Sequence, residues 1–341
     1  MWKYILIVIV FVINSRNVSG SWGILGLNIS PQWFQPDQYD SYAEEVLALG
    51  PAVVRWNFNI DPFAGKVLDP VTWKPVDFES RYVPLLKAFS SRGIEVSVIL
   101  IVGRQQIQDA KQGHYTFEYL GSAYANTSAQ ITRDWLIPNG IRNVELGNEY
   151  NDDGSWPDPY SNKTASAAQY MTMLRPTYTA VKAEYNKTGV YSHVMMMGLS
   201  LCDVDYLNGL YLSGLQSYTD KINFHPYDFY ENADNIVPKI NGMLTIMNKY
   251  GDGNRQIWLT EYGAQAAPGN QPQLDNQATF VHTSIRTMHA QLPQIEKALW
   301  FNLQDFMSGT TPVQYGLKDM SSNHKPSYQA FIDQAKEGDS S

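Results

Sequence analysis

Cysteine is nearly absent from this chain of 341 residues, in which Cys202 is the only one. A lone thiol cannot form an internal disulfide, so the fold must be stabilised by a large hydrophobic core. Cys202 follows the largely apolar run Leu199-Ser200-Leu201. This setting predicts a small, buried hydrophobic side chain.

Long hydrophobic runs are also missing, apart from residues 4–13 near the N-terminus. This run is shorter than the ~20 apolar residues that a bilayer-spanning helix needs. It follows Lys3 and precedes the small residues Ser19 and Gly20, a pattern typical of a secretory signal peptide, although a retained membrane anchor is an alternative. We expect residues 1–20 to be the signal peptide. Residues 21–341 would then be secreted, or lie in the lumen of a secretory organelle, free of the membrane.

Positive charge is scarce, because 25 Lys and Arg stand against 33 Asp and Glu and give a net charge of −8. Such a chain, without a cluster of basic residues, is a poor binder of nucleic acid, and a neutral partner is expected. Four Asn-x-Ser/Thr triplets are compatible with a secreted glycoprotein, although such triplets also arise by chance. They begin at Asn28, Asn126, Asn162 and Asn186.

Several catalytic and cofactor motifs do not occur in the sequence. The run Gly198-Leu199-Ser200-Leu201-Cys202 lacks the second glycine of a serine-hydrolase elbow. There is no His-Glu-x-x-His pair for zinc and no glycine loop that would hold a phosphate. We therefore expect no metal and no cofactor.

Short apolar runs alternate with longer stretches of helical period along the chain. Most of the apolar runs are continuous, as expected for strands that are covered on both faces. The stretches between them are amphipathic, which is typical of helices that cover a sheet. The predicted strands are residues 23–28, 52–57, 95–102, 142–148, 193–199, 221–226, 256–260 and 297–302, and the predicted helices are 39–49, 80–91, a segment within 115–126, 165–185, 204–212, 232–250, 275–291 and 326–335.

Eight strands, each followed by a helix, predict one α/β domain with the (β/α)8 TIM-barrel fold over residues 21–341. An open doubly wound sheet uses the same alternation. A dinucleotide-binding sheet of that kind would have G-x-G-x-x-G after its first strand, and residues 23–28 do not fit this spacing. The polar stretches 151–162 and 263–272 are expected to be loops at the C-terminal face of the barrel, where the active site would lie.

Two predicted strands end in a carboxylate, the fourth in Asn148-Glu149 and the seventh in Thr260-Glu261. An acid at the end of an apolar strand must be solvated, paired or functional, because burial of a bare charge is prohibitive. Strands four and seven lie on opposite walls of a barrel, so their ends should face one cavity. Glycoside hydrolysis with retention of configuration needs such a pair, about 5–5.5 Å apart.

The surroundings of both glutamates resemble clan A of the retaining glycoside hydrolases, which includes cellulase-like, mannanase-like, xylosidase-like and glucuronidase-like families. The resemblance rests on Asn148-Glu149 and on Glu261 within the segment 258–263, Trp-Leu-Thr-Glu-Tyr-Gly. It implies a retaining hydrolase that cleaves the β-linked bonds of a neutral glycan or oligosaccharide. In this scheme Glu149 is the acid/base, Glu261 is the nucleophile, and Asn148 forms a hydrogen bond with the 2-hydroxyl of the sugar.

The resemblance extends to two other strands. Arg55 ends the second strand, where the clan often has an arginine that would keep the nucleophile ionised; pairing of Arg55 with Glu145 is the alternative. His225-Pro226-Tyr227 on the sixth strand is similar to the clan's His-x-Tyr element. Tyr227 would then hold the nucleophile, and His225 would adjust the acid/base.

Aromatic side chains are expected to contact the sugar. Trp300 on the eighth strand would form the floor of the sugar site by stacking on a sugar ring, with packing in the core as the alternative. Other aromatic residues lie in predicted loops and would either line sugar subsites or pack against their own loops. They are Trp33, Phe34, Trp73, Trp156, Tyr160 and Tyr230.

One departure from the clan leaves the family and the sugar open. Cellulase-like members usually have a histidine at the end of strand three, where this chain has Ile101-Val102-Gly103-Arg104-Gln105. The segment 145–149, Glu-Leu-Gly-Asn-Glu, is closer to the xylosidase-like and glucuronidase-like relatives.

Two other functions would use the same barrel. A catalytically inactive glycan-binding barrel would usually lack one of the two acids, and both are present here. A transglycosylase would use both acids, with a sugar acceptor in place of water. We expect a monomeric hydrolase whose partner is its carbohydrate substrate and whose pH profile is bell-shaped with an acidic-to-neutral optimum.

Overall fold

The computed structural model describes residues 23–30, 36–69, 74–152, 154, 156–157 and 160–337. The predicted signal peptide, residues 1–20, lies outside these residues. Within the described segments, every helix is too short or too polar to span a bilayer.

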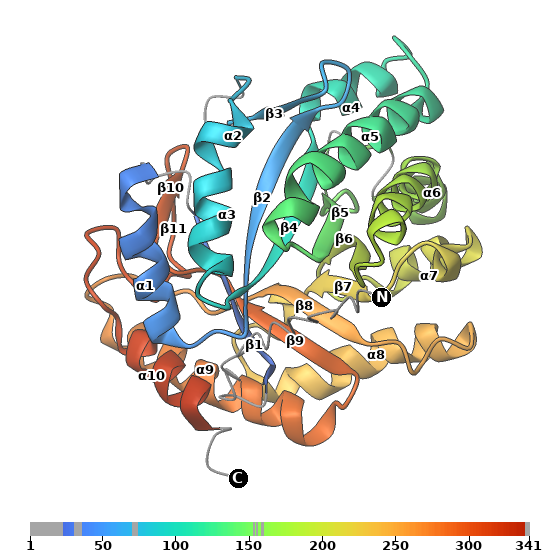
Figure 1. The fold of residues 1–341 in the computed structure, drawn as a ribbon. Coiled ribbons are helices and arrows are strands. Elements are labelled where there is room, and N and C mark those ends of the chain that lie inside the picture. Colours follow the sequence, from blue (N-terminus) through green and yellow to red (C-terminus); the bar gives the residue numbers. More distant parts are fainter. Residues whose placement is uncertain are drawn as a thin grey trace, which may run out of the picture.

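Eight parallel strands form a closed barrel (Figure 1). Strand β1 pairs with β2 on one side and with β9 on the other, which closes the sheet. The predicted TIM barrel is therefore confirmed, and the open doubly wound sheet is excluded. The barrel strands are β1 (Leu25–Asn28), β2 (Val53–Asp61), β4 (Glu95–Val102), β5 (Asn143–Asn148), β6 (His193–Ser200), β7 (Ile222–His225), β8 (Ile257–Tyr262) and β9 (Ile295–Trp300).

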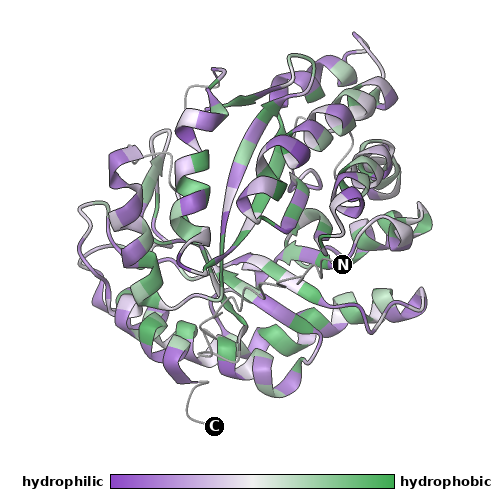
Figure 2. Cartoon of the chain, in the orientation of Figure 1, coloured by the Kyte–Doolittle hydropathy of each residue, from purple (hydrophilic) through white to green (hydrophobic). Residues whose placement is uncertain are grey.

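Helices surround the barrel and combine hydrophobic with hydrophilic positions (Figure 2). The first of them, α1, buries one face that includes Tyr42, Val46 and Leu49. Helices α1 and α7 begin and end at the predicted residues. The helices are α1 (Tyr39–Leu49), α2 (Phe78–Arg81), α3 (Val83–Ser90), α4 (Arg104–Lys111), α5 (Phe117–Ile131), α6 (Lys163–Thr188), α7 (Val204–Leu212), α8 (Ile236–Lys249), α9 (Gln271–Gln291) and α10 (Pro326–Lys336).

The single helix predicted over residues 80–91 is wrong, because two helices, α2 and α3, occupy this segment. Pro84 lies in the first turn of α3. Its ring removes a backbone donor and would clash with the carbonyl group four residues earlier in a continuous helix. Helix α4 was not predicted at all, and α5 continues five residues beyond the predicted segment, to Ile131.

The barrel interior changes from apolar to polar along its axis. Val53, Met195, Trp258 and Leu299 form a small buried cluster of their own. Two residues further along β2, on the same face of the strand, lies the buried Arg55. The apolar base thus supports a polar layer nearer the C-terminal ends of the strands, where the site of a TIM barrel lies.

Short antiparallel strands extend this end of the barrel. Strand β3 (Lys66–Leu68) pairs with the end of β2, and β10 (Phe306–Ser308) pairs with β11 (Thr311–Val313) in a hairpin after β9. Each has only three residues, which is too short for a recognisable alternation in the sequence. The hairpin brings Phe306 to the mouth of the barrel, as described below.

The Asn-x-Ser/Thr triplets differ in accessibility. Asn28 is buried in β1, where its side chain donates to the carbonyl oxygen of Thr260 at 2.8 Å, so a glycan does not fit there in the folded chain. Asn126, Asn162 and Asn186 are exposed. Glycosylation at these three positions stays a prediction.

Candidate active site

Arg55 lies at the centre of the polar layer and is almost fully buried. Its Nε and Nη2 atoms donate to the two carboxylate oxygens of Glu145 at 2.6 and 3.0 Å. Its Nη1 atom donates to Oε1 of Glu261 at 2.7 Å. Both partners proposed from the sequence, Glu145 and Glu261, are therefore present. One guanidinium group pairs with two carboxylates and compensates part of their negative charge.

The neighbours of this ion pair satisfy the remaining polar atoms. Arg55 also donates to the Oδ1 atoms of Asn28 at 2.8 Å and Asn148 at 3.2 Å, and Asn223 donates to Glu145 at 2.7 Å. Complete pairing of this kind is what makes a buried charge tolerable. Because Oδ1 of Asn148 accepts from Arg55, its amide NH2 is the group left to donate to a ligand.

Replacement of Arg55 by methionine should lower the free energy of unfolding by about 3–5 kcal/mol, because it leaves the buried Glu145 without its counter-charge. Chemical denaturation followed by circular dichroism measures this change. The matched control is Arg92→Met, since Arg92 pairs with the exposed carboxylates of Asp40 and Glu44 and should cost no more than about 1 kcal/mol. Equal losses for the two variants would contradict the central role of Arg55.

Glu261 points into the barrel because β8 is irregular. The register of β8 against β9 shifts between Leu259 and Tyr262. In a regular strand consecutive side chains alternate between faces, whereas a bulge re-aims one of them. Here the side chain of Thr260 bonds within the buried polar layer, and that of the next residue, Glu261, bonds to Arg55.

The surroundings of Glu261 favour its ionised form. Tyr227 donates its hydroxyl proton to Oε2 of Glu261 at 3.0 Å, and 13% of the Glu261 side chain is exposed. Burial alone would raise the pKa of Glu261, but the charges of His225 and Arg55, with hydrogen bonds from Arg55 and Tyr227, outweigh it, so this pKa lies below its ordinary value. Burial and the nearby carboxylates raise the pKa of Tyr227, which keeps its proton available for donation.

Glu149 is placed by an unusual backbone at the end of β5. Its φ is 51° and that of Gly147 is 99°, both in the left-handed region. A side chain at position 147 would also clash with Tyr150, since its Cβ would lie 2.7 Å from a ring carbon. One third (33%) of the Glu149 side chain is exposed, which makes it the more accessible of the two acids.

His225 connects the two acids from below and is fully buried. Its Nδ1 lies 2.7 Å from Oε1 of Glu149 and its Nε2 lies 3.0 Å from Oγ1 of Thr260. Gly198 makes room for the ring, because a Cβ there would lie 2.1 Å from Nε2. Burial would lower the pKa of His225, but the charge of Glu261, with the hydrogen bond and charge of Glu149, raises it above the ordinary value.

The two acids face each other at short range. One carboxylate oxygen of Glu149, one of Glu261 and a ring nitrogen of His225 all lie within 4.8 Å of one another. A divalent ion could be held by such a trio, but the hydrogen bonds to Arg55 and His225 already engage both acids, and the guanidinium cation would repel a metal. The spacing matches that of a pair of carboxylates on either side of one sugar bond.

A cavity of about 310 Å³ adjoins Glu261. Asn148 lines it together with Asn28 and Asn57, so polar amides surround its base. Ile99 and Ile101, from the strand that lacks the clan's histidine, form an apolar wall. The complete lining is Asn28, Ile29, Ser30, Arg55, Trp56, Asn57, Ile99, Ile101, Asn148, Glu261, Phe301 and Phe306.

The prediction that Trp300 forms the floor of the sugar site is wrong. Trp300 has no exposed surface and packs edge-on against Tyr262, with ring centroids 5.3 Å apart, so no sugar ring can stack on it. The alternative, packing in the core, holds. The next residue, Phe301, lies in the cavity with Phe306 from the β10–β11 hairpin, and neither was identified from the sequence.

The aromatic residues of the predicted loops do not behave alike. Trp156 is fully buried and stacks on Tyr150 at 4.5 Å, so it packs its own loop and does not line a subsite. Tyr160 and Tyr230 are exposed. Trp33, Phe34 and Trp73 lie outside the described residues.

Comparison of the sequence with known families gives one match. The family model described as "Glycosyl hydrolase catalytic core" matches residues 161–330, which include His225, Tyr227 and Glu261. This match confirms the predicted class of enzyme, an O-glycosyl hydrolase. No curated protein matches the sequence significantly.

Solved structures of glycoside hydrolases share the fold. A family 39 glycoside hydrolase from the gut symbiont Bacteroides cellulosilyticus WH2 has a TM-score of 0.65 at 17% identity, over 92% of this chain and 63% of that one. A GH5_18 protein from Bifidobacterium longum subsp. infantis has a TM-score of 0.64 at 17% identity, over 92% and 78%. A GH113 β-1,4-mannanase has a TM-score of 0.57 at 13% identity, over 92% and 97%.

At these identities the likeness concerns the fold, and the chain spans less than two thirds of the length of the first of these proteins. The resemblance to clan A glycoside hydrolases is confirmed at this level, and no individual family within the clan is fixed.

Proposed function

We propose that this protein is a retaining glycoside hydrolase that cleaves β-linked bonds of a neutral glycan, with Glu149 as acid/base and Glu261 as nucleophile. The observation that carries this proposal is the approach of the two acids, whose oxygens lie within 4.8 Å beside a cavity large enough for a sugar ring. Retaining enzymes need this short separation, whereas inverting enzymes need room for a water molecule between the acids.

Hydrolysis would proceed in two displacements. An oxygen of Glu261 attacks the anomeric carbon and forms an ester with it, while Glu149 gives its proton to the leaving glycosidic oxygen. Glu149, now a carboxylate, takes a proton from water, whose oxygen attacks the same carbon and releases Glu261. Two inversions at one carbon restore the original configuration.

The neighbouring residues suit these two roles. Against the effect of burial, His225, Arg55 and Tyr227 together lower the pKa of Glu261, which favours the ionised form that a nucleophile needs. Asn148 presents its amide NH2 to the cavity beside Glu261, a suitable position for a hydrogen bond to the 2-hydroxyl of the sugar. His225 lies at hydrogen-bond distance from Glu149 and would act as a positioning residue that orients the acid/base.

Replacement of Tyr227 by phenylalanine should reduce kcat roughly 10–100-fold, because a hydrogen bond to a charged group contributes about 1.5–3 kcal/mol. It should also move the acidic limb of the pH–rate profile to higher pH. Glu261 must be ionised to attack, and loss of a hydrogen bond that lowers its pKa lets it take up a proton at higher pH. Initial rates measured from about pH 3 to pH 9 test both expectations.

The matched control is Tyr315→Phe. The Tyr315 ring lies 5.3 Å from that of Tyr227, but its hydroxyl accepts from Gln265 and does not contact Glu261. This variant should keep the acidic limb in place. A shift of the same size in both variants, or in neither, would contradict the role given to Tyr227.

Hydrolysis of a panel of substrates tests the function itself. The panel contains aryl β-glycosides of mono- and disaccharides together with β-glucans, mannans and xylans. Proton NMR of the first-formed sugar shows its anomeric configuration, and the proposal requires the β-anomer to appear first. Absence of cleavage across the whole panel would favour an inactive glycan-binding barrel, and predominance of transfer over hydrolysis without an added acceptor would identify a transglycosylase.

The setting of the enzyme is part of the proposal. A secreted or secretory-lumenal monomer, released from its signal peptide after Gly20 and glycosylated at exposed asparagines, accords with the N-terminal sequence. Sequencing of the mature N-terminus and light scattering test these two features.

A further inference from the structure

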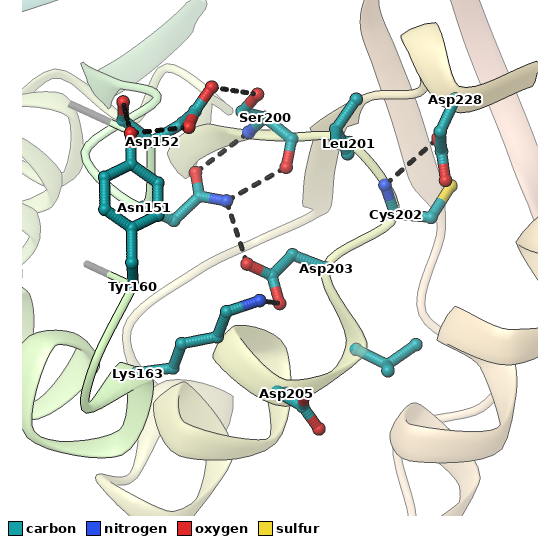
Figure 3. A pocket seen from close by; sticks show the side chains of 11 residues that line it. Asn151, Asp152, Tyr160, Lys163, Ser200, Leu201, Cys202, Asp203, Asp205 and Asp228 are labelled. Atoms are coloured by element: carbon teal, nitrogen blue, oxygen red, sulfur yellow. Dashed lines mark hydrogen bonds and ion pairs between the residues drawn. The ribbon is translucent and has the colours of Figure 1, made fainter. Parts of the chain in front are cut away.

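A second cavity, of about 340 Å³, lies at the same end of the barrel, beyond strands β5 and β6 and before helix α7 (Figure 3). It shares no lining residue with the cavity beside Glu261. Its walls combine carboxylates with one cation and with the exposed side chains of Leu201 and Tyr160. The lining is Asn151, Asp152, Tyr160, Lys163, Ser200, Leu201, Cys202, Asp203, Val204, Asp205 and Asp228.

The proposed acid/base, Glu149, lines neither cavity but lies between them along the chain, because Asn148 lines the first cavity and Asn151 lines the second. The backbone N–H of Asp152 donates to the carbonyl oxygen of Glu149 at 2.9 Å, so a tight turn joins the acid to this lining residue of the second cavity. Asn151 fixes this edge by bonding to both the N–H and the carbonyl of Ser200.

We propose that the second cavity binds the sugar on the leaving side of the scissile bond, and that it accepts an uncharged sugar and rejects a uronic acid. This inference rests on the proposed function. A general acid gives its proton to the leaving oxygen, so the leaving group must lie on the side of Glu149, away from the nucleophile. The cavity beside Glu261 then holds the sugar that is attacked.

The charge of the second cavity supports this preference. Asp152, Asp203, Asp205 and Asp228 all line it. Lys163 pairs with Asp203 at 2.8 Å and Lys239 pairs with Asp228 at 2.9 Å, so among the described lining residues the excess negative charge comes from Asp152 and Asp205. Carboxylate oxygens accept hydrogen bonds from sugar hydroxyl groups, and they repel the carboxylate of a uronic acid. Asp205 lines the cavity from the first turn of α7, is exposed, and has no hydrogen bond or ion pair to the other residues drawn in Figure 3.

Leu201 supplies an apolar surface on the opposite wall (Figure 3). Its φ is 61°, a conformation that a leucine rarely adopts, and 43% of its surface is exposed. The strained backbone thus holds a hydrophobic side chain in the open, where it gains little from core packing. Strained backbone conformations are common at ligand sites. The apolar C–H face of a sugar ring could pack against the exposed side chain of Leu201.

Transfer to added acceptors isolates this cavity from the other. In a retaining enzyme an acceptor sugar on the leaving side attacks the ester carbon through a hydroxyl oxygen, gives its proton to Glu149 and releases Glu261. The donor is whichever 4-nitrophenyl β-glycoside of the panel is cleaved. The acceptors are methyl β-glucoside and methyl β-glucuronide at equal concentration and pH 6, and the readout is the ratio of the two transfer products.

The wild-type enzyme should prefer the neutral acceptor by roughly tenfold or more. Asp205→Lys should reduce this preference roughly fivefold, because it replaces a repelling charge by an attracting one. Leu201→Gly, which also suits the left-handed backbone, should lower transfer to methyl β-glucoside roughly threefold relative to hydrolysis. The control Asp333→Lys makes the same change of charge on the exposed surface of α10 and should leave the ratio unaltered.

The outcomes separate the two proposals. Three results would overturn the leaving-side site alone, provided that the donor is cleaved. They are absence of transfer to both acceptors, equal transfer to both acceptors, and a ratio of the two transfer products that Asp205→Lys leaves unchanged. Absence of cleavage with every donor and polysaccharide would overturn the glycosidase function and this inference with it.

Discussion

Replacement of Glu261 by alanine should lower the rate of glycoside cleavage by on the order of 10⁴-fold or more, because it removes the carboxylate that we propose forms the intermediate. The loss should be equally large for substrates with good and poor leaving groups. Added azide should occupy the space of the missing carboxylate and attack directly. Since only one displacement then occurs, the product should be a glycosyl azide of inverted, α configuration.

The measurement combines steady-state rates on an activated aryl glycoside with NMR of the azide product. Glu261→Gln is the companion variant, since it keeps the shape of the side chain and its capacity to accept from Tyr227 but cannot act as a carboxylate nucleophile. Both variants must keep the far-ultraviolet circular dichroism of the wild type. Retention of more than about a tenth of the wild-type activity by either one would remove Glu261 from its assigned role.

Replacement of Glu149 by alanine should produce a different pattern of loss. Proton transfer contributes about 10²–10⁴-fold, and its value depends on how much help the leaving group needs. Formation of the ester should therefore stay fast for an activated aryl glycoside and become very slow for a disaccharide. Azide should rescue turnover of the activated substrate and yield a β-azide, because it attacks the ester after a first inversion.

The pH dependence provides a second criterion for Glu149. The wild-type rate should fall at high pH, where a general acid no longer carries the proton that the leaving oxygen needs. With alanine at position 149 there is no acid to titrate, so the alkaline limb should disappear for the activated substrate. Persistence of this limb, or an α-azide product, would show that the two acids have been assigned in the wrong order.

Much of the fold was predictable because its signals are local. The apolar segment 95–102 was predicted as a strand and coincides with β4, since a strand covered on both faces needs a continuous hydrophobic run. The pairing of Glu149 with Glu261 followed from the topology, since strands on opposite walls of a closed barrel bring their ends together. The contacts of Arg55, His225 and Tyr227 with the two acids could also be predicted, because they depend only on the positions of their strands in the barrel.

The remaining features depend on geometry that has no local signal. The irregularity in β8 sends Thr260 and Glu261 into the same polar layer, whereas simple alternation would have separated them. An error of one residue in the side-chain alternation also explains why Trp300, and not Phe301, was predicted to line the sugar site. Cys202 was expected in the core and is only partly buried, at the edge of the second cavity.

The position of Glu145 has a consequence for how such an enzyme can change over time. This carboxylate is inaccessible to solvent and holds Arg55 in place from within the barrel, independently of the loops above. The electrostatic environment of Glu261, the proposed nucleophile, is thus set by the buried core of the barrel. The residues that would contact the sugar come largely from strand ends and from the β10–β11 hairpin. New substrate preferences can therefore evolve, or be engineered, by exchange of these outer segments without rebuilding the machinery beneath them.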